Sequence, residues 1–303
     1  MLVSVIVPAC AAERTIGRCI ASLLAQTHKD WEAVIVADDG GDYAALLAGI
    51  GLVDPRLRFV STGAVRSGCH NARNVGLAAA QGEIIAALDA DDFYDPRRLA
   101  ALVPLAAAHG AIADAVAVVS DEDGRTLYTT PSRAAAPRLS AEALLDLGAP
   151  LFPVLRRSLA VPRLVGIEYA EDVVANLRLI EMLGALPVFP HALYRYRVVP
   201  GSLCHDANSG ARFEAAYSAY LTRLRSGDGF GLVATRAAAL RGFARKRALN
   251  RLFIKAQRRE PDLTFQHFLA RDHGSPADAL ARLPPSPPLA RRGKPELRVG
   301  DAD

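Results

Sequence analysis

The chain has 303 residues, of which 51% are hydrophobic and 22% are charged. This composition is typical of globular proteins, and the length allows one large domain or two small ones. The formal net charge of +4 is too mild to indicate a nucleic-acid-binding protein, although nine Lys or Arg residues lie in the acid-free segment 236–259.

Short apolar runs alternate with segments of helical spacing over the first hundred residues. The pattern predicts strands at 2–7, 31–37, 56–60 and 83–88, with helices at 13–26, 43–50 and 69–80 and a further helix that starts at Asp95-Pro96. Four strand–helix alternations indicate parallel strands joined by crossover helices. The expected fold class is therefore α/β, with a mostly parallel sheet flanked by helices.

The second half of the chain is less regular. It predicts two strands at 115–120 and 126–129, an extended segment at 186–199, and helices at 140–147, 170–183, 213–224 and 235–257. The segment 284–303 is rich in Pro, Arg and Gly, and this composition predicts a disordered tail.

Cysteine spacing and hydropathy indicate the compartment. No two cysteines have the short spacing of a zinc knuckle or a redox dithiol, which favours reduced thiols; they are Cys10, Cys19, Cys69 and Cys204. The N-terminal apolar run is short and lacks the basic region of a signal peptide. The apolar-rich segment 99–119 is interrupted by Pro104, His109 and Asp114, so it does not predict a membrane span. We expect a soluble, cytoplasmic protein.

Sparse polar groups follow three of the predicted strands. They are Pro8-Ala9 after the first strand, Asp38-Asp39 after the second, and Asp89, Asp91 and Asp92 after the fourth. Ligands of open α/β sheets bind outside the carboxyl ends of the strands, so these residues predict a site on one rim of the sheet.

The fourth strand ends in the acidic sequence AALDADD. Carboxylates this close together repel one another unless a positive charge lies between them. Mg²⁺ or Mn²⁺ takes carboxylate oxygens and keeps positions open for phosphate, so the cluster predicts a clamp for a metal ion and a diphosphate. The alternative is a solvated acidic turn that caps the next helix.

Two further segments could add to this site. Asp39 precedes Gly40 and Gly41, and its carboxylate could accept the imide N–H of a uracil ring; the alternative is an Asx-turn. Arg66 and Arg73 lie in RSGCHNARNVG, where an arginine could reach the phosphates by a bidentate pair. The alternative for each arginine is an ordinary surface charge.

Three segments carry a family resemblance. SVIVPAC, SLLAQTHKDWEAVIVADDGGD and NARNVGLAAAQGEIIAALDADD closely resemble, in order and spacing, the family 2 glycosyltransferases of the GT-A fold. The resemblance is dense over 2–100, continues more thinly to about residue 205, and does not cover the rest. It implies a Rossmann-like GT-A domain over 1–225, with a nucleotide-binding half (1–115) and an acceptor half (116–225). A basic helical extension (226–283) and the tail would follow.

The resemblance also implies ligands and roles. A nucleotide-diphosphate-sugar donor would be held by Mn²⁺ or Mg²⁺, with inversion at the sugar. By similarity, Asp39 reads the base, most often uracil, and Pro8 and Ala9 line the nucleotide pocket. Asp91 and Asp92, with Asp89, correspond to the cluster that binds the metal and the diphosphate.

The second half carries two more matches. The segment 169–174, YAEDVV, resembles the family's catalytic-base motif, with Asp172 as the general base and Glu171 facing the acceptor or orienting Asp172. The alternative is that acids favour the first turn of a helix because of its dipole. LYRYR and PGSLCH resemble the family's closing segment, which makes His205 a candidate metal ligand or, alternatively, an ordinary surface histidine.

The chain also departs from the family pattern. Cys10-Ala11 replaces the usual Tyr-Asn, Gly41 replaces a serine, and Ala170 stands where Trp or Phe is usual. These changes affect the expected donor identity and acceptor shape. They remove no charged catalytic residue.

The expected function is an inverting, metal-dependent glycosyltransferase. The resemblance implies transfer of a sugar from a nucleotide-diphosphate donor, in this family most often a UDP-sugar, to a saccharide or lipid-linked acceptor in polysaccharide or glycolipid synthesis. The rivals are a non-catalytic sugar-nucleotide-binding protein, which the intact acids disfavour, and a nucleotidyltransferase, whose Gly-rich loop is missing after the first strand. No nucleic-acid partner is expected. The segment 236–259 could touch the inner face of the membrane or pack its Leu and Phe residues on the domain.

Overall fold

The computed structural model describes residues 1–131, 137–164, 166–167, 169–199, 204, 206 and 208–272. Its strands are β1 (Val3–Ala9), β2 (Trp31–Ala37), β3 (Leu57–Ser61), β4 (Ile84–Ala87), β5 (Phe93–Tyr94), β6 (Ala111–Ser120), β7 (Thr126–Thr130), β8 (Arg138–Leu139), β9 (Val154–Arg156) and β10 (Leu186–Val198). Its α-helices are α1 (Ile16–Leu24), α2 (Tyr43–Gly49), α3 (Cys69–Ala79), α4 (Arg98–His109), α5 (Ala141–Leu145), α6 (Glu171–Leu183), α7 (Ser209–Ser226), α8 (Arg236–Gln257) and α9 (Phe265–Asp272).

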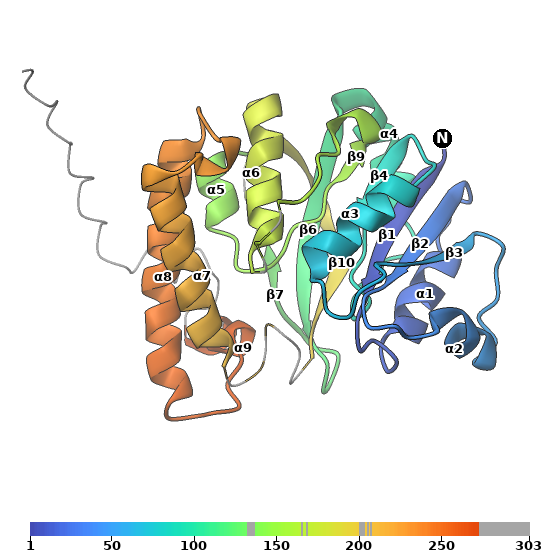
Figure 1. Cartoon of the computed structure of the whole chain (residues 1–303), viewed down its shortest axis with the longest axis horizontal. Helices are drawn as coiled ribbons and strands as arrows, with labels where there is room; N and C mark the ends of the chain where they lie inside the picture. The colour runs from blue at the N-terminus through green and yellow to red at the C-terminus, as the bar shows by residue number, and fades with distance from the viewer. Residues whose placement is uncertain are drawn as a thin grey trace, which may run out of the picture.

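The strands form a central sheet in the order β3-β2-β1-β4-β9-β6-β10-β5, with β7 beside β6 and β8 beside β10 (Figure 1). The ladders among β1 to β4 are parallel, as is the ladder between β6 and β10. Because β1, β2 and β4 are buried on both faces, their sequences are continuous apolar runs rather than alternating ones. The expected α/β class with a mostly parallel sheet is confirmed.

Helix α3 packs closely on this parallel half. A Cβ atom at Gly76 would lie 2.5 Å from the Cγ2 atom of Ile6, so only glycine allows the helix to approach β1 this closely. The contacts of α3 with β1, β2 and β3 place it over the strand β2, which carries Asp38 at its carboxyl end. The site residues of α3 are thereby held above the rim.

Several predicted boundaries were wrong. The helix expected to begin at Asp95-Pro96 begins at Arg98, because the Asp95 main chain instead pairs with β10, its N–H donating to the Leu193 carbonyl at 2.8 Å.

The three-residue strand β9 joins the two parallel groups by antiparallel pairing with β4 and β6. Strands as short as β5, β8 and β9 show no periodicity, so the sequence did not predict them.

A buried ion pair ties the half of the sheet that contains β6 and β10 to α4. Arg98 and Asp114 are almost inaccessible and lie 2.7 Å apart, and Arg98 also donates to the Phe152 carbonyl at 2.8 Å. Asp114 accepts a further hydrogen bond from the Leu193 N–H at 3.2 Å. The pair therefore joins α4, β6, β10 and the chain before β9.

Replacing Asp114 with asparagine should lower the free energy of unfolding by about 3 kcal/mol or more, because it leaves a buried guanidinium without its counter-charge. Denaturant unfolding followed by circular dichroism measures the change. The control is Asp123→Asn, in an exposed pair with Arg125 at 3.5 Å, which should leave the free energy of unfolding nearly unchanged. Equal stability of the two variants would contradict the expectation.

The C-terminal helices α7 and α8 pack side by side at the end of the molecule remote from β1 to β3 (Figure 1). Phe243, Leu249 and Phe253 of α8 are buried, in agreement with the interpretation of 236–259 as a packed helix. Many of its arginines form ion pairs within the chain, with acids of α5, of the residue that follows α5, and of α7. The pairs are Arg241–Glu142, Arg245–Asp146, Arg247–Glu214 and Arg251–Glu214. A membrane contact stays a prediction.

In the described ranges, none of the helices has the length and apolar character needed to cross a membrane. The tail 284–303 lies outside the described residues. The expected division of the chain at residue 225 stays a prediction.

Candidate active site

The three acids after β4 form one cluster. Asp89, Asp91 and Asp92 each offer a carboxylate oxygen, and these oxygens all lie within 4.8 Å of one another. The chain turns sharply after the strand, with the Asp92 N–H donating to the Asp89 carbonyl at 3.0 Å. The structure thus brings together three predicted metal ligands at the carboxyl end of a buried strand.

Strand β10 holds this cluster from behind. The Tyr194 hydroxyl accepts from the Asp89 N–H at 3.2 Å and donates to Asp92 Oδ2 at 2.7 Å. The Arg197 N–H donates to Asp92 Oδ1 at 2.8 Å, and its Nη1 donates to the Asp91 carbonyl at 3.0 Å. The sequence analysis assigned no role to Tyr194 or Arg197, although the segment LYRYR that contains them matched the family.

The cluster is electrostatically strained without a cation. Burial and the neighbouring Asp89 raise the pKa of Asp91 to about 6. Burial, followed by the charges of Asp91 and Asp89, raises the pKa of Asp92 well above its usual value. A divalent ion between the oxygens would offset this repulsion, and an all-oxygen donor set suits Mg²⁺ or Mn²⁺. The residues present therefore fit such an ion.

A buried arginine links the cluster to α6. The guanidinium of Arg73, on α3, forms ion pairs with both Asp89 and Glu171, and Arg163 approaches Glu171 at 3.3 Å. Burial opposes ionisation of Glu171, but the charges of Arg73 and Arg163 outweigh it and hold its pKa below the usual value. The expectation that Arg73 reaches phosphates stays a prediction, since the structure places it between two carboxylates.

Asp172 lies in the first turn of α6, next to this ion-pair network. Its Oδ2 accepts a hydrogen bond from the Leu151 N–H at 3.3 Å, and no described partner is recorded for its Oδ1. Ala170, with φ of 53°, makes the left-handed turn that leads into the helix. Burial, reinforced by the charge of Glu171, raises the pKa of Asp172 to about 6. Such a carboxylate is ionised at neutral pH and still basic enough to accept a proton.

This pKa predicts a pH dependence. A general base must be deprotonated, so the turnover rate should rise about tenfold per pH unit below pH 6 and level off above it. The rate should be measured from pH 5 to 8 at saturating Mn²⁺, because the Asp91 and Asp92 carboxylates also lose protons when they bind metal. A rate that stays flat from pH 5 to 8 would contradict this assignment.

Asp39 is already well hydrogen-bonded. Its Oδ2 accepts from the Ala11 N–H at 2.6 Å and the Tyr43 hydroxyl at 2.7 Å. Its Oδ1 accepts from the Gly41 N–H at 2.9 Å, which is the Asx-turn considered above. Asp39 thus ties the loop after β1 to the loop after β2. Its role in reading a base stays a prediction.

Its neighbour Asp38 organises the next loop. The buried carboxylate of Asp38 accepts from the Thr62 hydroxyl at 2.9 Å and from the Ser67 and Gly68 N–H groups at 3.1 and 2.9 Å. Arg66 sits in the loop so fixed, with φ of 57° and its N–H on the Asp38 carbonyl. Asp38 was predicted only as one of the polar groups at the rim of the sheet, from its position after β2, and its role in fixing this loop was not predicted.

The remaining predicted residues are placed as follows. Pro8 is half-buried at the end of β1, whereas Ala9 has no exposed surface and belongs to the core. Direct contact of Ala9 with a ligand would therefore require the overlying loop to move, and a nucleotide-binding role for either residue stays a prediction. His205 lies outside the described residues, so its candidacy as a metal ligand is untested.

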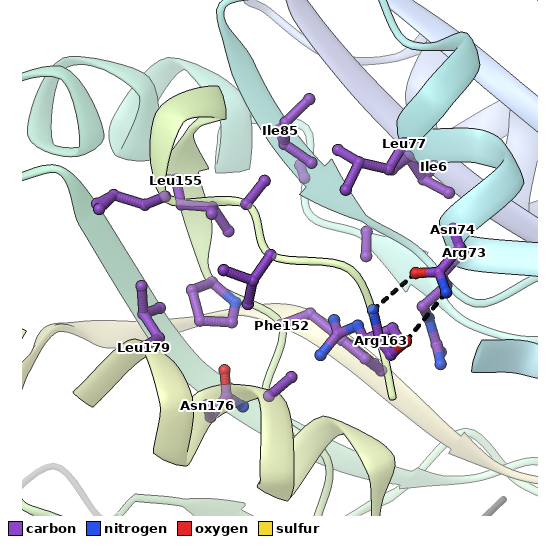
Figure 2. A pocket seen from close by; sticks show the side chains of 17 residues that line it. Ile6, Arg73, Asn74, Leu77, Ile85, Phe152, Leu155, Arg163, Asn176 and Leu179 are labelled. Atoms are coloured by element: carbon purple, nitrogen blue, oxygen red, sulfur yellow. Dashed lines mark hydrogen bonds between the residues drawn. The ribbon is translucent and has the colours of Figure 1, made fainter. Parts of the chain in front are cut away.

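A cavity of about 70 Å³ is lined in part by Arg73 and Arg163, the two arginines that pair with Glu171 (Figure 2). Asn74 and Arg163 meet at its edge, with the Asn74 side chain donating to the Arg163 carbonyl at 3.0 Å and accepting from the Arg163 N–H at 2.6 Å. Arg73 also lines it, but neither Asp91 nor Asp172 does. Sites for small ligands usually measure about 300–1,000 Å³, so this cavity is too small for a sugar nucleotide.

The sequence is similar to several bacterial proteins. Succinoglycan biosynthesis protein ExoO of Rhizobium meliloti is 34% identical over 221 residues, which cover 66% of this chain and 62% of that protein. UDP-Glc:alpha-D-GlcNAc-diphosphoundecaprenol beta-1,3-glucosyltransferase WfgD of Escherichia coli is 37% identical over 98 residues, which cover 32% of this chain and 38% of that protein. The matched part of this chain thus spans less than two thirds of either relative.

Two solved structures share the fold. The Staphylococcus aureus protein TarS, residues 1–349 with UDP-GlcNAc, superposes with a TM-score of 0.62 at 18% identity, covering 89% of this chain and 79% of that one. The mannosyltransferase PcManGT of Pyrobaculum calidifontis, with GDP-Man and Mn²⁺, has a TM-score of 0.56 at 17% identity, covering 92% and 86%. Residues 4–160 match the model of the family described as Glycosyl transferase family 2, and the chain therefore belongs to that family.

Proposed function

We propose that the protein is an inverting, metal-dependent glycosyltransferase that moves a sugar from a nucleotide-diphosphate donor to an acceptor hydroxyl. One observation carries the proposal. The acidic cluster, whose oxygens lie within 4.8 Å of one another, is joined through Arg73 to the helix that carries Asp172. A site that binds the leaving diphosphate is thus coupled to a site that can accept a proton.

The proposed reaction is a single displacement. Asp89, Asp91 and Asp92 would hold the divalent ion, whose Lewis acidity supplies charge neutralisation for the departing diphosphate. Asp172 Oδ1 accepts the proton of the acceptor hydroxyl while that oxygen bonds to the anomeric carbon. The bond from this carbon to the diphosphate oxygen breaks at the same time, and attack from the opposite face inverts the carbon.

Glu171 is assigned the role of orienting Asp172. Its carboxylate is 5% exposed and held between Arg73 and Arg163, a placement that supports this role over direct contact with the acceptor. The pair of arginines fixes the first turn of α6 and thereby the direction of the neighbouring Asp172 side chain.

The proposed donor is a UDP-sugar and the proposed acceptor is a saccharide or a lipid-linked saccharide at the inner face of the membrane. The names of relatives support the class: WfgD is named for UDP-Glc and a diphosphoundecaprenol acceptor, and TarS was solved with UDP-GlcNAc. Peripheral contact would fall to the exposed basic residues at the end of α8, Lys255, Arg258 and Arg259.

A thermal-shift panel tests the proposal. UDP-glucose, UDP-N-acetylglucosamine and GDP-mannose are each added with and without Mn²⁺. We expect one UDP-sugar to raise the melting temperature in a Mn²⁺-dependent way, because a ligand that binds only the folded state stabilises it. No response to any nucleotide sugar would argue against the proposal, and a response to GDP-mannose alone would correct the donor class.

A further inference from the structure

A buried chain segment connects the C-terminal helices to Asp172. Residues 146–152, here named the strap, link α5 to β9, and the side chains of Leu147, Leu151 and Phe152 in it are buried. Buried main-chain groups need hydrogen-bond partners, and a loop has no ladder or helix to provide them. Side chains from five other elements, α4, α6, α8, α9 and β7, take this role in the strap.

One end of the strap lies against α6. The Leu151 N–H donates to Asp172 Oδ2 at 3.3 Å, and Asn176 Nδ2 donates to the Leu151 carbonyl at 2.7 Å. The Phe152 ring stacks near the Arg73 guanidinium, whose carbon lies 5.0 Å from the ring centroid. The position of this end therefore determines which oxygen of Asp172 is engaged.

The other end is held by helices outside the matched family segment, which ends at residue 160. Lys246 Nζ of α8 donates to the Leu147 carbonyl at 2.6 Å. Gln266 Nε2 of α9 donates to the Gly148 carbonyl at 3.1 Å. The single proton of the Tyr128 hydroxyl, on β7, is shared between Gln266 Oε1 and this carbonyl, which lies 3.3 Å from the hydroxyl oxygen. These bonds fix two consecutive carbonyls of the strap.

The approach of α8 to this end is unusually close. A Cβ atom at Gly242 would lie 2.5 Å from the Cβ of Leu145, the last residue of α5. Only glycine permits this packing, which brings Lys246, one helical turn further along α8, to the start of the strap.

We infer that Lys246 and Gln266 are positioning residues for Asp172: they hold the strap so that the Leu151 N–H stays on Oδ2 and leaves Oδ1 for the acceptor proton. This inference rests on the proposed function, in which Asp172 is the general base. It gives the C-terminal helices a part in the reaction although they contribute no residue to the metal cluster.

Lys246 also acts through its charge. Burial lowers the pKa of Lys246 to about 8, against the attraction of Asp172 and Asp146, which favours the charged form. Because this pKa is above 7, Lys246 is protonated at neutral pH. The same attraction favours ionised Asp172, so that removing the cation should raise the pKa of Asp172. The other charged or titratable groups that act on Asp172 or feel its charge are Glu171, Arg73, Arg163, Tyr217, Tyr220 and Cys204.

The test compares Lys246→Met and Lys246→Arg with Lys29→Met in the full-length chain. Lys29 is a matched control, because its ammonium also donates to a main-chain carbonyl, that of Gln26 at 2.8 Å, just before the amino-terminal end of β2. The activity readout is UDP release from UDP-glucose or UDP-N-acetylglucosamine with Mn²⁺, resolved into kcat, donor KM and the pH profile of kcat. Amide hydrogen exchange of the strap provides a readout without turnover.

We expect Lys246→Met to lower kcat about tenfold with unchanged donor KM, and to move the acid limb of the profile upward by about half a pH unit. Lys246→Arg should restore both, and Lys29→Met should match the wild type. Exchange in the strap and the first turn of α6 should accelerate in Lys246→Met alone. Should this variant not fold, Tyr128→Phe, which deletes the hydroxyl that contacts both Gln266 and the Gly148 carbonyl, should lower kcat with donor KM unchanged.

Wild-type kinetics and exchange in Lys246→Met would overturn the inference. An equal loss of activity at every pH, with an unmoved acid limb, would also overturn it, because a purely structural bond would produce that result. If Tyr128→Phe is used in place of Lys246→Met, an unchanged kcat in Tyr128→Phe would overturn the inference. Asp172→Asn is measured in parallel. If it keeps full transfer, the base assignment fails and the inference with it; if it loses transfer while Lys246→Met behaves as wild type, only the role of the strap fails.

Discussion

Replacing Asp172 with asparagine should lower kcat by about 10²–10⁴-fold, the usual contribution of a general base. Asparagine has nearly the same shape, and its amide oxygen can still accept the Leu151 N–H that now lies 3.3 Å from Oδ2. The variant loses only the ability to take up a proton. Initial rates of UDP release, measured with a fixed donor and Mn²⁺, give the change.

Two further measurements make this prediction specific. Donor binding should persist in Asp172→Asn, with the same Mn²⁺-dependent thermal shift as the wild type, because the acidic cluster is unaltered. Asp123→Asn, at the exposed turn between β6 and β7, should retain full turnover. Retention of more than about a tenth of wild-type kcat in Asp172→Asn would be inconsistent with a general base at this position.

The sheet of the first ninety residues was predictable because local signals and tertiary context agree there. β1, β2 and β4 are apolar runs followed by Pro, Asp or Gly signals, and α1 carries a clear apolar stripe. β2 was predicted to the residue, at Trp31–Ala37. Parallel pairing followed from the alternation itself, since the connections contain helices.

The second half was less predictable because its pairings are non-local. β10 lies parallel to β6, with two register shifts, although some seventy residues separate them in sequence. β9 enters the middle of the sheet with three residues. Nothing in the local sequence of these segments specifies their neighbours, and short antiparallel ladders carry too few residues to show a period.

The site residues, like the sheet, were predictable only in part. The carboxylates were predictable, because acids at the end of a buried strand are costly and require a reason. The contacts of the groups that position them were not: Arg73, Arg163 and Tyr194 act across 8 to 105 residues of sequence. An arginine in a helix is normally a surface charge, and only the fold shows that Arg73 is 6% exposed between two carboxylates.

Asp91 and Asp92 should respond differently to substitution, although both were predicted as metal ligands. Asp91→Asn should weaken Mn²⁺-dependent UDP binding by about 100-fold or more, since a ligand loss exceeds the 10- to 100-fold effect of outer-shell changes. Asp92→Asn should weaken binding too, but it also disturbs the fold. Asp92 is 1% exposed and accepts from the Tyr194 hydroxyl and the Arg197 N–H, at 2.7 and 2.8 Å.

The change in the free energy of unfolding without metal distinguishes Asp91→Asn from Asp92→Asn. The pKa of Asp91 rises to about 6 in the folded state, above that of the unfolded chain, so its ionisation costs folding stability increasingly as pH rises from 4 to 6. Asp91→Asn cannot ionise, and at pH 7 without Mn²⁺ it should be at least as stable as the wild type. The pKa of Asp92 is raised as well, so Asp92→Asn also removes an ionisation cost. It leaves a buried partner unsatisfied, however, which costs about 1–3 kcal/mol, and we therefore expect it to be less stable than Asp91→Asn.

Denaturant unfolding at pH 7 in the presence of EDTA, followed by calorimetric titration of Mn²⁺ and UDP into each folded variant, measures both quantities. The two acids would then have different roles. The Asp91 carboxylate would serve to bind the cation, whereas the Asp92 carboxylate would also accept the hydrogen bonds that join β10 to the turn after β4. If Asp91→Asn bound Mn²⁺ and UDP as tightly as the wild type, the acidic cluster would not be the site of the metal.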